Sequence, residues 1–448
     1  MWVFGVEKVN PVFSTLYEKV KKIDLTAQGN LLHLKVTLPS EVSFSLLSWL
    51  AAQVYYPQFY WQHRDEHEEV AACGQLCCFN HIQDARQFLV THQSDINIDD
   101  VRIWGLNAWD TIIPGRIDEI NGDDAYLFLP RIEIRRHQQQ LSIHLNLLGE
   151  TDKKDSLDFL QTLNQSQDIE PLSVSVTQVN HSLTQEQWTH YLNIALDEIS
   201  QGLFEKVVPA RATCLTLDNP LKAIQFMKAS RDVNHHCYHY MLAFSPSDAF
   251  MGSTPERLYK RDELMLYTEA LAGTVASSDN EQQATEFAEW LMNDKKNQHE
   301  NLVVVDDICQ RLQGGVEGID VSPADVIRLR KVQHLRRYIH GKLIYSDDID
   351  CLKRLQPTAA VCGLPRSVAR AFIRQHEPFE RRWYAGSAGY LSLPHAEFAV
   401  SLRCGELHDD TLTLYAGAGV VAGSDPQQEW TEIENKAAGL RTLLEKES

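Results

Sequence analysis

The sequence is short of positive charge, of cysteine and of long apolar runs, and each shortage excludes a class of protein. Its 42 lysine and arginine residues stand against 61 aspartate and glutamate residues, which gives 448 residues a formal net charge of −19. Such a surface repels phosphate backbones and anionic lipids unless a basic patch offsets it. The densest basic stretch, residues 328–337, has five basic side chains among apolar ones. We therefore expect no nucleic-acid partner and no membrane partner.

No stretch reaches the roughly 18 uninterrupted apolar residues that a membrane-spanning helix needs. The first ten residues, MWVFGVEKVN, lack the basic start and the apolar run of a secretory signal. The nine cysteines are few and odd in number. Cys73, Cys77 and Cys78 cluster without a second Cys/His pair at zinc-finger spacing, which favours packing near a turn over a metal site. Together these features indicate a cytoplasmic protein with reduced thiols.

The chain divides into two parts. Residues 1–170 are predicted to form a strand-rich N-terminal half, because residues 31–38 and 125–134 alternate between apolar and polar side chains. A helix is expected over 83–93. The polar segment 148–171 indicates a surface helix and a connection between the parts.

Residues 180–448 are predicted to form the second part and to carry the chemistry. A helix begins at Thr184, whose spacing to Gln187 is that of a capping box, and ends at Gly202. Longer helices are predicted over 281–312 and 426–444, the second starting at the Asp425–Pro426 pair. Strands are predicted at 206–211, 385–392, 398–403 and 412–416. Strands and helices mix without a regular βαβ rhythm, which favours an α+β fold with layered, mostly antiparallel sheets.

Several charged residues in this second part have both an ordinary and a functional interpretation. Glu429, Glu432 and Lys436 share one face of the last predicted helix, as on many solvated surface helices. The glycine-rich turn Gly417-Ala418-Gly419 before that helix, however, lets backbone N–H groups approach a ligand. Glu300 lies where a helix turns strongly apolar, and carboxylates from two helices commonly hold Mg²⁺. Lys206, Glu256 and Arg403 occupy strand ends or turns, where each is either exposed or functional. A dinucleotide-binding loop at 417–423 is excluded, because too few residues follow it for the rest of that fold.

Taken in order, the motifs of residues 184–444 resemble the chorismate-utilising enzymes, which include anthranilate, aminodeoxychorismate, salicylate and isochorismate synthases. The motifs are KVVPAR, FMGSTPERL, YTEALAGT, HENLVVVDD, VQHL, PTAAVCGLP, WYAGSAGY, FAVSLR and GAGVVAGSDPQQEWTEIENKAAGL. Together with FYWQHRDEHEEVAACG in the N-terminal half, they are most similar to the isochorismate synthases of menaquinone biosynthesis.

The resemblance implies an α+β fold around a central cleft, a chorismate site and dependence on Mg²⁺. Glu300 and Glu432 would be the metal ligands, with Glu429 in the outer shell. Lys206 would be the general base and Glu256 the general acid. The substrate carboxylates and hydroxyl would be held by Thr274, Tyr384, Arg403, Lys436 and the amides from Gly417 to Gly419.

Forming isochorismate requires water to add at C2 of chorismate while the C4 hydroxyl leaves. Hydroxide is a poor leaving group, so Glu256 must be protonated, and Lys206 must be neutral to accept a proton from water. Asn297 replaces a glutamate that we expect in the amine-transferring relatives, and Ala270 stands where many relatives have proline. Ala272 occupies the position of the nucleophilic lysine of aminodeoxychorismate synthases.

Isochorismate synthase is therefore the function that the sequence favours, with no amidotransferase subunit as a partner. The alternatives are a salicylate synthase, which also eliminates pyruvate, and the chorismate-binding component of an amine-transferring enzyme. A non-catalytic relative is disfavoured because every proposed acid, base and ligand is present.

Overall fold

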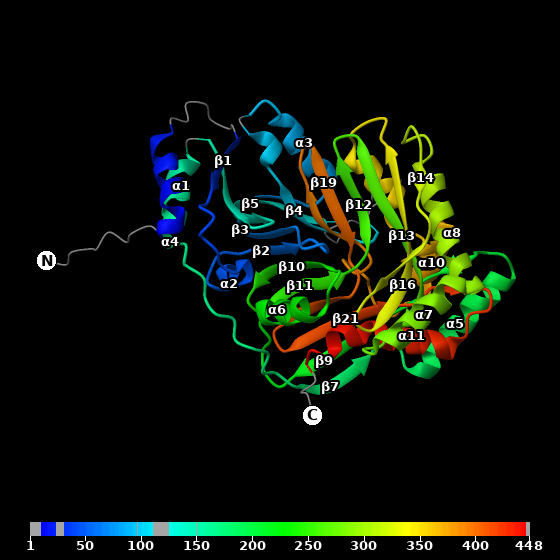
Figure 1. The fold of residues 1–448 in the computed structure, drawn as a ribbon. Coiled ribbons are helices and arrows are strands. Elements are labelled where there is room, and N and C mark those ends of the chain that lie inside the picture. Colours follow the sequence, from blue (N-terminus) through cyan, green and yellow to red (C-terminus); the bar gives the residue numbers. More distant parts are fainter. Residues whose placement is uncertain (1–9, 24–30, 96, 111–124, 150, 445–448) are drawn as a thin grey trace.

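In the computed structural model, strands from both halves of the chain join one large sheet (Figure 1). The structure describes residues 10–23, 31–95, 97–110, 125–149 and 151–444. The sheet's strands in the first half are β1 (Leu31–Thr37), β2 (Gln58–Gln62), β3 (Glu68–Phe79), β4 (Ile103–Asn107), β5 (Ala125–His137) and β6 (Gln140–Leu148). Those in the second half are β7 (Val176–His181), β9 (Ala210–Leu217), β10 (Tyr238–Ser245), β11 (Asp248–Thr254), β12 (Arg257–Asp262), β13 (Met265–Ala276), β14 (Asp320–Val321), β15 (Asp325–Arg328), β16 (Val332–Lys342), β18 (Ser387–Leu391), β19 (His395–Val400), β20 (Cys404–His408) and β21 (Thr411–Gly417).

Two antiparallel pairings connect the halves: β2 pairs with β10, and β4 pairs with β18. From β10 the ladder continues through β11, β20, β21 and β9 to β7. From β18 it continues through β19, β12 and β13 to β16. Figure 1 shows these two runs as separate layers, the first across the lower part of the view and the second at the upper right. This arrangement confirms the predicted α+β class with large antiparallel sheets.

A separate small sheet consists of β8 (Lys206–Val207), β17 (Gly363–Leu364) and β22 (Val420–Val421), with β8 in the middle. It brings together three of the recognised motifs, which lie far apart in the sequence. The central position of β8 fixes the backbone of Lys206 from both sides.

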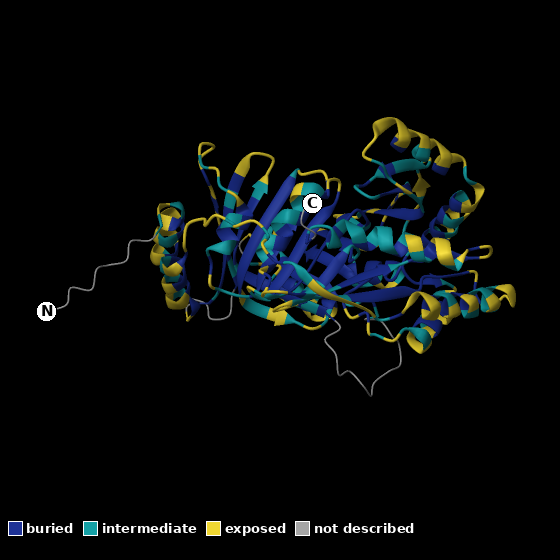
Figure 2. Ribbon diagram, turned by 90° about the horizontal axis from the view of Figure 1, so that it is seen from below, coloured by how far each residue is buried: buried dark blue, intermediate teal, exposed yellow. Residues whose placement is uncertain are grey.

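The large sheet is covered on both faces, as strand β2 illustrates. Successive side chains of a strand point to opposite faces. Phe59 and Trp61 belong to one apolar cluster, and Tyr60 belongs to the other. All three are completely buried. Figure 2 shows buried strands at the centre and exposed residues gathered on helices and loops at the periphery.

The helices are α1 (Pro11–Lys22), α2 (Leu46–Ala51), α3 (Ile82–Thr91), α4 (Asp152–Thr162), α5 (Gln185–Ser200), α6 (Ala223–Val233), α7 (Glu281–Asn293), α8 (Lys295–Leu312), α9 (Asp348–Leu355), α10 (Arg366–His376) and α11 (Pro426–Arg441). The predicted capping box opens α5: the Thr184 hydroxyl accepts from the Gln187 amide, and the Gln187 side chain accepts from the Thr184 amide. No helix within the described ranges is long and apolar enough to cross a bilayer.

Three local predictions were wrong. The strand predicted over 206–211 is interrupted after Val207, because β8 belongs to the small sheet and β9 of the large sheet begins at Ala210. The helix predicted over 281–312 is two helices, because Asp294 ends α7 in an extended conformation and its side chain caps α8 by accepting from the Asn297 amide at 2.8 Å. The strand predicted over 398–403 ends at Val400 instead. Arg403 adopts a left-handed conformation with φ of 46° and turns the chain toward β20. Phe398 and Val400 do not alternate with exposed residues, because both faces of β19 are buried.

Five of the nine cysteines are buried, three are partly buried and Cys78 is exposed. All nine are free thiols. Cys73 is buried in the middle of β3, whereas Cys77 and Cys78 lie near the end of that strand. None of the three belongs to a group of potential metal ligands among the described residues.

Candidate active site

The residues singled out from the sequence converge on one cavity. Eight of the ten line it: Glu256, Thr274, Glu300, Tyr384, Arg403, Gly417, Gly419 and Lys436. Glu432 lines an adjoining cavity, which shares Thr274, Glu300 and Gly419 with the first. Lys206, the tenth, reaches the same place from β8 and contacts Glu300. Side chains that are more than 200 positions apart thus meet at one end of the layered sheets.

Three carboxylates lie together where α8 meets α11. Glu300 comes from α8, and Glu429 and Glu432 come from one face of α11. Glu429 is 3% exposed. Burial, together with the negative charges of Glu432 and Glu300, raises the pKa of Glu429 to about 7, although Lys296 lowers it. Repulsion of this kind is what a divalent cation between carboxylates relieves.

Two lysines partly neutralise this cluster. Lys436 Nζ lies 2.6 Å from a Glu432 oxygen, one helical turn away, and donates to the Gly417 carbonyl at 3.0 Å. Lys206 Nζ donates to Glu300 Oε1 at 2.9 Å. The Lys206 side chain is only 1% exposed, so the ion pair with Glu300 directs its amine toward the cavity.

Glycine is required at positions 417 and 419 because atoms of neighbouring residues lie too close for a side chain. A Cβ atom added to Gly419 would lie 2.5 Å from Glu300 Oε1 and 3.1 Å from the Cε of Lys206. A Cβ atom added to Gly417 would lie 2.8 Å from the Tyr384 hydroxyl. A larger residue at position 419 would therefore displace Glu300 and Lys206, and a larger residue at position 417 would displace Tyr384.

Glu256 lies in the tight connection between β11 and β12 and is 2% exposed. Burial raises its pKa to about 8, and the negative charge of Glu269 adds to the increase. Lys206, Lys436 and Arg403 act in the opposite direction. At neutral pH Glu256 therefore holds a proton that it can donate, which is the state that a general acid needs.

His334 is a site residue that the sequence analysis missed, although it lies in the motif VQHL. An arginine can only donate hydrogen bonds, so the 2.9 Å contact between Arg403 Nη2 and His334 Nε2 makes this nitrogen an acceptor. The other ring nitrogen then donates to Thr274 Oγ1 at 3.0 Å. Burial and the charges of Arg403 and Lys436 hold the pKa of His334 well below its usual value, so the ring stays neutral. His334 thus orients both Arg403 and Thr274.

The remaining wall is partly aromatic and apolar. Tyr384 stacks on Tyr415 with ring centroids 5.2 Å apart. Burial raises the pKa of the Tyr384 phenol, which therefore remains a hydrogen-bond donor. Leu271, Val361 and Leu402 are among the apolar residues of the lining. Asn297, which we had noted as a departure from relatives, accepts from the Thr274 amide at 3.0 Å. Its neutral amide lines the same cavity as the carboxylates of Glu300, Glu429 and Glu432.

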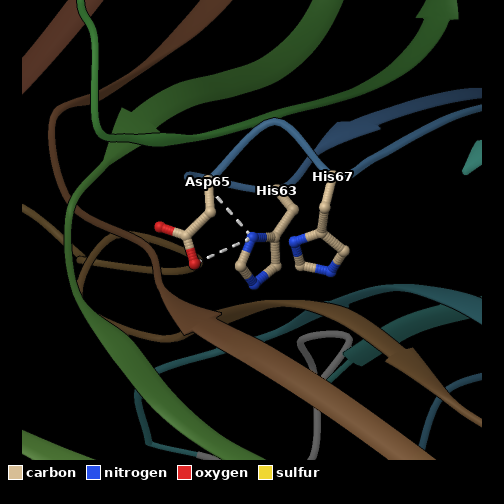
Figure 3. Close-up of side chains that lie close together, drawn as sticks. All are labelled: His63, Asp65 and His67. Carbon is tan, nitrogen blue, oxygen red and sulfur yellow. Dashed lines mark hydrogen bonds and ion pairs between the residues drawn. The ribbon is translucent and has the colours of Figure 1, made fainter. Parts of the chain in front are cut away.

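A second cluster, His63, Asp65 and His67, has the composition of a metal site but not its chemistry (Figure 3). His63 Nδ1 accepts from the Asp65 amide at 3.1 Å, and its Nε2 lies 3.3 Å from the Glu397 carboxylate. Since a metal needs a free nitrogen lone pair, the engaged ring of His63 is a poor ligand. His63 instead fixes the turn between β2 and β3 and contacts buried Glu397.

Comparison with known proteins agrees with this geometry. The family model described as chorismate binding enzyme matches residues 18–445. Isochorismate synthase MenF of Escherichia coli (strain K12) is 48% identical over 416 residues, which cover 92% of this chain and 93% of that protein. Isochorismate synthase MenF of Pasteurella multocida (strain Pm70) is 38% identical, covering 91% and 92% of the two chains.

The fold comparison reaches the same family. The solved structure of MenF, the menaquinone-specific isochorismate synthase from Escherichia coli, superposes with a TM-score of 0.90 at 46% identity, covering 97% of this chain and 99% of that one. The match of a family model to nearly the whole length, together with relatives at this level of identity, shows that the chain belongs to the chorismate binding enzyme family.

Proposed function

We propose that the protein is an isochorismate synthase, an isomerase that converts chorismate to isochorismate and depends on Mg²⁺. The single observation that carries the proposal is one cavity that is lined by the buried carboxyl group of Glu256 and by Glu300, whose carboxylate accepts from the amine of Lys206. The names of its relatives at 48% and 38% identity support it.

Substrate binding follows from charge. Chorismate is a dianion, and a protein with a net charge of −19 must attract it locally. Arg403 and Lys436 line the cavity and supply two positive charges. Tyr384 and Thr274 offer hydroxyl groups, and Gly417 and Gly419 line the same cavity, whereas the Ala418 amide donates to the Pro209 carbonyl at 3.0 Å. We propose that these groups hold the two carboxylates and the hydroxyl.

Glu256 and Lys206 carry out the two proton transfers of the reaction. Glu256 donates a proton to the C4 hydroxyl, which leaves as water. In its neutral form Lys206 accepts a proton from the water that adds at C2, and the double bonds of the ring shift between these positions. A cation held by Glu300 would replace the ion pair that favours the charged form of the Lys206 amine. One water is consumed and one is released, so the net reaction is an isomerisation.

The carboxylate cluster suits Mg²⁺. Glu300 and Glu432 would hold the ion and Glu429 would lie behind them, because hard oxygen donors on two facing helices are the ligands that this cation prefers. Burial and the negative charges of Glu432 and Glu300 raise the pKa of Glu429, and a bound cation would relieve the repulsion among these carboxylates. When bound, Mg²⁺ supplies positive charge that binds and orients a substrate carboxylate.

The catalytic part of the chain, the cellular location, the subunit composition and the pathway belong to the same proposal. Residues 180–448 carry the chorismate-binding catalytic core, since all ten site residues lie between 206 and 436. We further propose that the enzyme works in the cytoplasm without an amidotransferase subunit. We also propose that it serves menaquinone biosynthesis, as the similarity to the solved structure of a menaquinone-specific isochorismate synthase suggests.

Product analysis tests the proposal. The purified protein is incubated with chorismate and Mg²⁺, and the products are separated by liquid chromatography and identified by mass. Isochorismate as the sole product, with chorismate regained in the reverse direction, is expected. Salicylate with stoichiometric pyruvate would assign a salicylate synthase instead, and anthranilate or an aminodeoxy compound formed with ammonium would assign an amine-transferring enzyme.

A further inference from the structure

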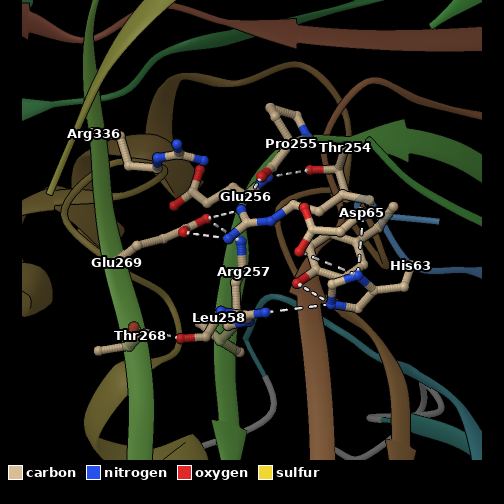
Figure 4. Close-up of polar contacts among 12 residues, drawn as sticks. His63, Asp65, Thr254, Pro255, Glu256, Arg257, Leu258, Thr268, Glu269 and Arg336 are labelled. Carbon is tan, nitrogen blue, oxygen red and sulfur yellow. Dashed lines mark hydrogen bonds and ion pairs between the residues drawn. The ribbon is translucent and has the colours of Figure 1, made fainter. Parts of the chain in front are cut away.

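One buried ion pair contacts the segment that carries Glu256, and Figure 4 shows its carboxylate, Glu269, beside residues 255–257. Arg64 lies in the turn between β2 and β3, and Glu269 lies on β13. The Arg64 guanidinium binds the Glu269 carboxylate through two parallel hydrogen bonds, of 2.6 Å and 2.8 Å. The exposed fractions of the two side chains are 4% and 0%. Such bidentate pairs are geometrically rigid.

This ion pair binds the main chain on both sides of Glu256. Arg64 Nη1 donates to the carbonyl of Pro255 at 2.7 Å. The amide of Arg257 donates to Glu269 Oε1 at 2.7 Å. The carbonyl of Glu256 itself accepts from the Val400 amide at 2.9 Å. These three hydrogen bonds fix the main chain on both sides of Glu256 and therefore the position from which its side chain enters the cavity.

Forming this buried ion pair carries a large desolvation penalty. Burying two charges costs several kcal/mol per ion, and apolar replacements of buried pairs are often neutral or stabilising. Burial of the charges alone therefore does not identify the role of Arg64 and Glu269. Their contacts with residues 255 and 257 point to control of residue 256 between them.

We propose that Arg64 and Glu269 form a clamp that positions the carboxyl group of Glu256 for proton donation and keeps a fixed negative charge beside it. The proposal rests on the proposed function, in which Glu256 is the acid. Arg64 and Glu269 are positioning residues, because they act on the substrate only through Glu256. The clamp also gives the N-terminal half a part in the reaction.

The negative charge of Glu269 should affect the pH at which Glu256 loses its proton, which a purely structural role would not. The charged groups that act on Glu256 are Glu269 from β13, Lys206 from β8, Lys436 from α11 and Arg403 from the turn before β20. Glu269 favours the protonated form of Glu256, and the three cations favour the ionised form. Removing the charge of Glu269 should thus let Glu256 lose its proton at lower pH.

Two conservative variants test the clamp. Arg64→Lys keeps a positive charge but cannot make the bidentate contact or reach both partners, and we expect kcat to fall by about 10²-fold with little change in KM. Glu269→Gln keeps the shape and an oxygen for the Arg257 amide. We expect the alkaline limb of its pH–kcat profile to move down by about one pH unit.

Arg261 and Asp348 provide the matched control. They form another bidentate pair, with two contacts of 2.8 Å and both side chains completely buried, away from the cavity. Arg261→Lys and Asp348→Asn should lower the melting temperature but leave kcat and the pH profile of the folded enzyme as in the wild type. If the control variants change kcat and the pH profile as the clamp variants do, the clamp has no specific role and the proposal is wrong.

Glu256→Gln separates failure of the clamp from failure of the proposed function. If Glu256→Gln is inactive while folded Arg64→Lys and Glu269→Gln keep the wild-type kcat and pH profile, the clamp alone is refuted. If Glu256→Gln keeps the wild-type rate, the acid lies elsewhere, and the clamp is refuted together with that assignment.

Discussion

Replacing Glu256 by glutamine should remove the activity and stabilise the folded protein at the same time. The pKa of this carboxyl rises from an ordinary 4.5 to about 8 because the group is buried and lies near Glu269. Below pH 4.5 the folded and unfolded states both hold the proton, so the group costs no stability. Between pH 4.5 and about 8 the folded state must hold a proton that the unfolded chain has released, and the free energy of unfolding falls as the pH rises.

The size of this effect follows from the pKa shift. Each pKa unit corresponds to about 1.4 kcal/mol, so retaining Glu256 costs about 3 kcal/mol at pH 7 and about 5 kcal/mol above pH 8. Glutamine has nearly the same shape, does not titrate and avoids this cost. The advantage of Glu256→Gln over the wild type should therefore be absent at low pH, grow through neutral pH and become constant above pH 8.

Urea denaturation at several pH values measures this difference directly. Wild type and Glu256→Gln are compared in EDTA without substrate, and Glu41→Gln, an exposed carboxyl, controls for the change in net charge. Turnover of chorismate is measured on the same samples with Mg²⁺ restored. A difference in unfolding free energy that does not change between pH 5 and pH 9 would refute the account of Glu256 as a buried, protonated acid. So would a variant that keeps more than half of the wild-type rate.

The metal and the base give two further predictions. EDTA should abolish activity and Mg²⁺ should restore it, and Glu300→Gln and Glu432→Gln should each be inactive with unchanged circular dichroism; full activity in EDTA would contradict the metal assignment. Lys206→Ala should lower kcat by about 10²–10⁴-fold, because water is then no longer activated. High ammonium should give no aminated product with either the wild type or Lys206→Ala, and a wild-type rate for Lys206→Ala would show that the base is another group.

Elements with a strong local signal could be predicted from the sequence. The helix α5 begins at Thr184 because its capping box needs no distant residue. The helix α11 begins after Asp425 for the same reason, since that side chain accepts from the amides of Gln427 and Gln428. The break at Asp294 also had a local cause, but the apolar periodicity continues across it and favours a single helix.

Features that depend on tertiary pairing could not be predicted. The end of β19 at Val400 is set by pairing with β18 and by the hydrogen bond to Glu256. His334 could not be identified as a site residue from the sequence, because its role depends on a contact with Arg403, which is 69 residues away in the sequence. Arg64 and Glu269 are 205 residues apart, and neither has a local pattern that indicates a buried ion pair. The ten predicted site residues were found through their motifs, whereas the contacts that orient them come only from the fold.

The origin of the C2 hydroxyl tests the central claim most directly. The enzyme is incubated with chorismate and Mg²⁺ in H₂¹⁸O, and isochorismate is analysed by mass spectrometry with fragment assignment. If Lys206 activates water while Glu256 expels the C4 hydroxyl, each product molecule formed in a single forward turnover carries one ¹⁸O, located at C2. Isochorismate without ¹⁸O would mean that the hydroxyl migrates within the substrate, and it would contradict the assigned roles of both residues.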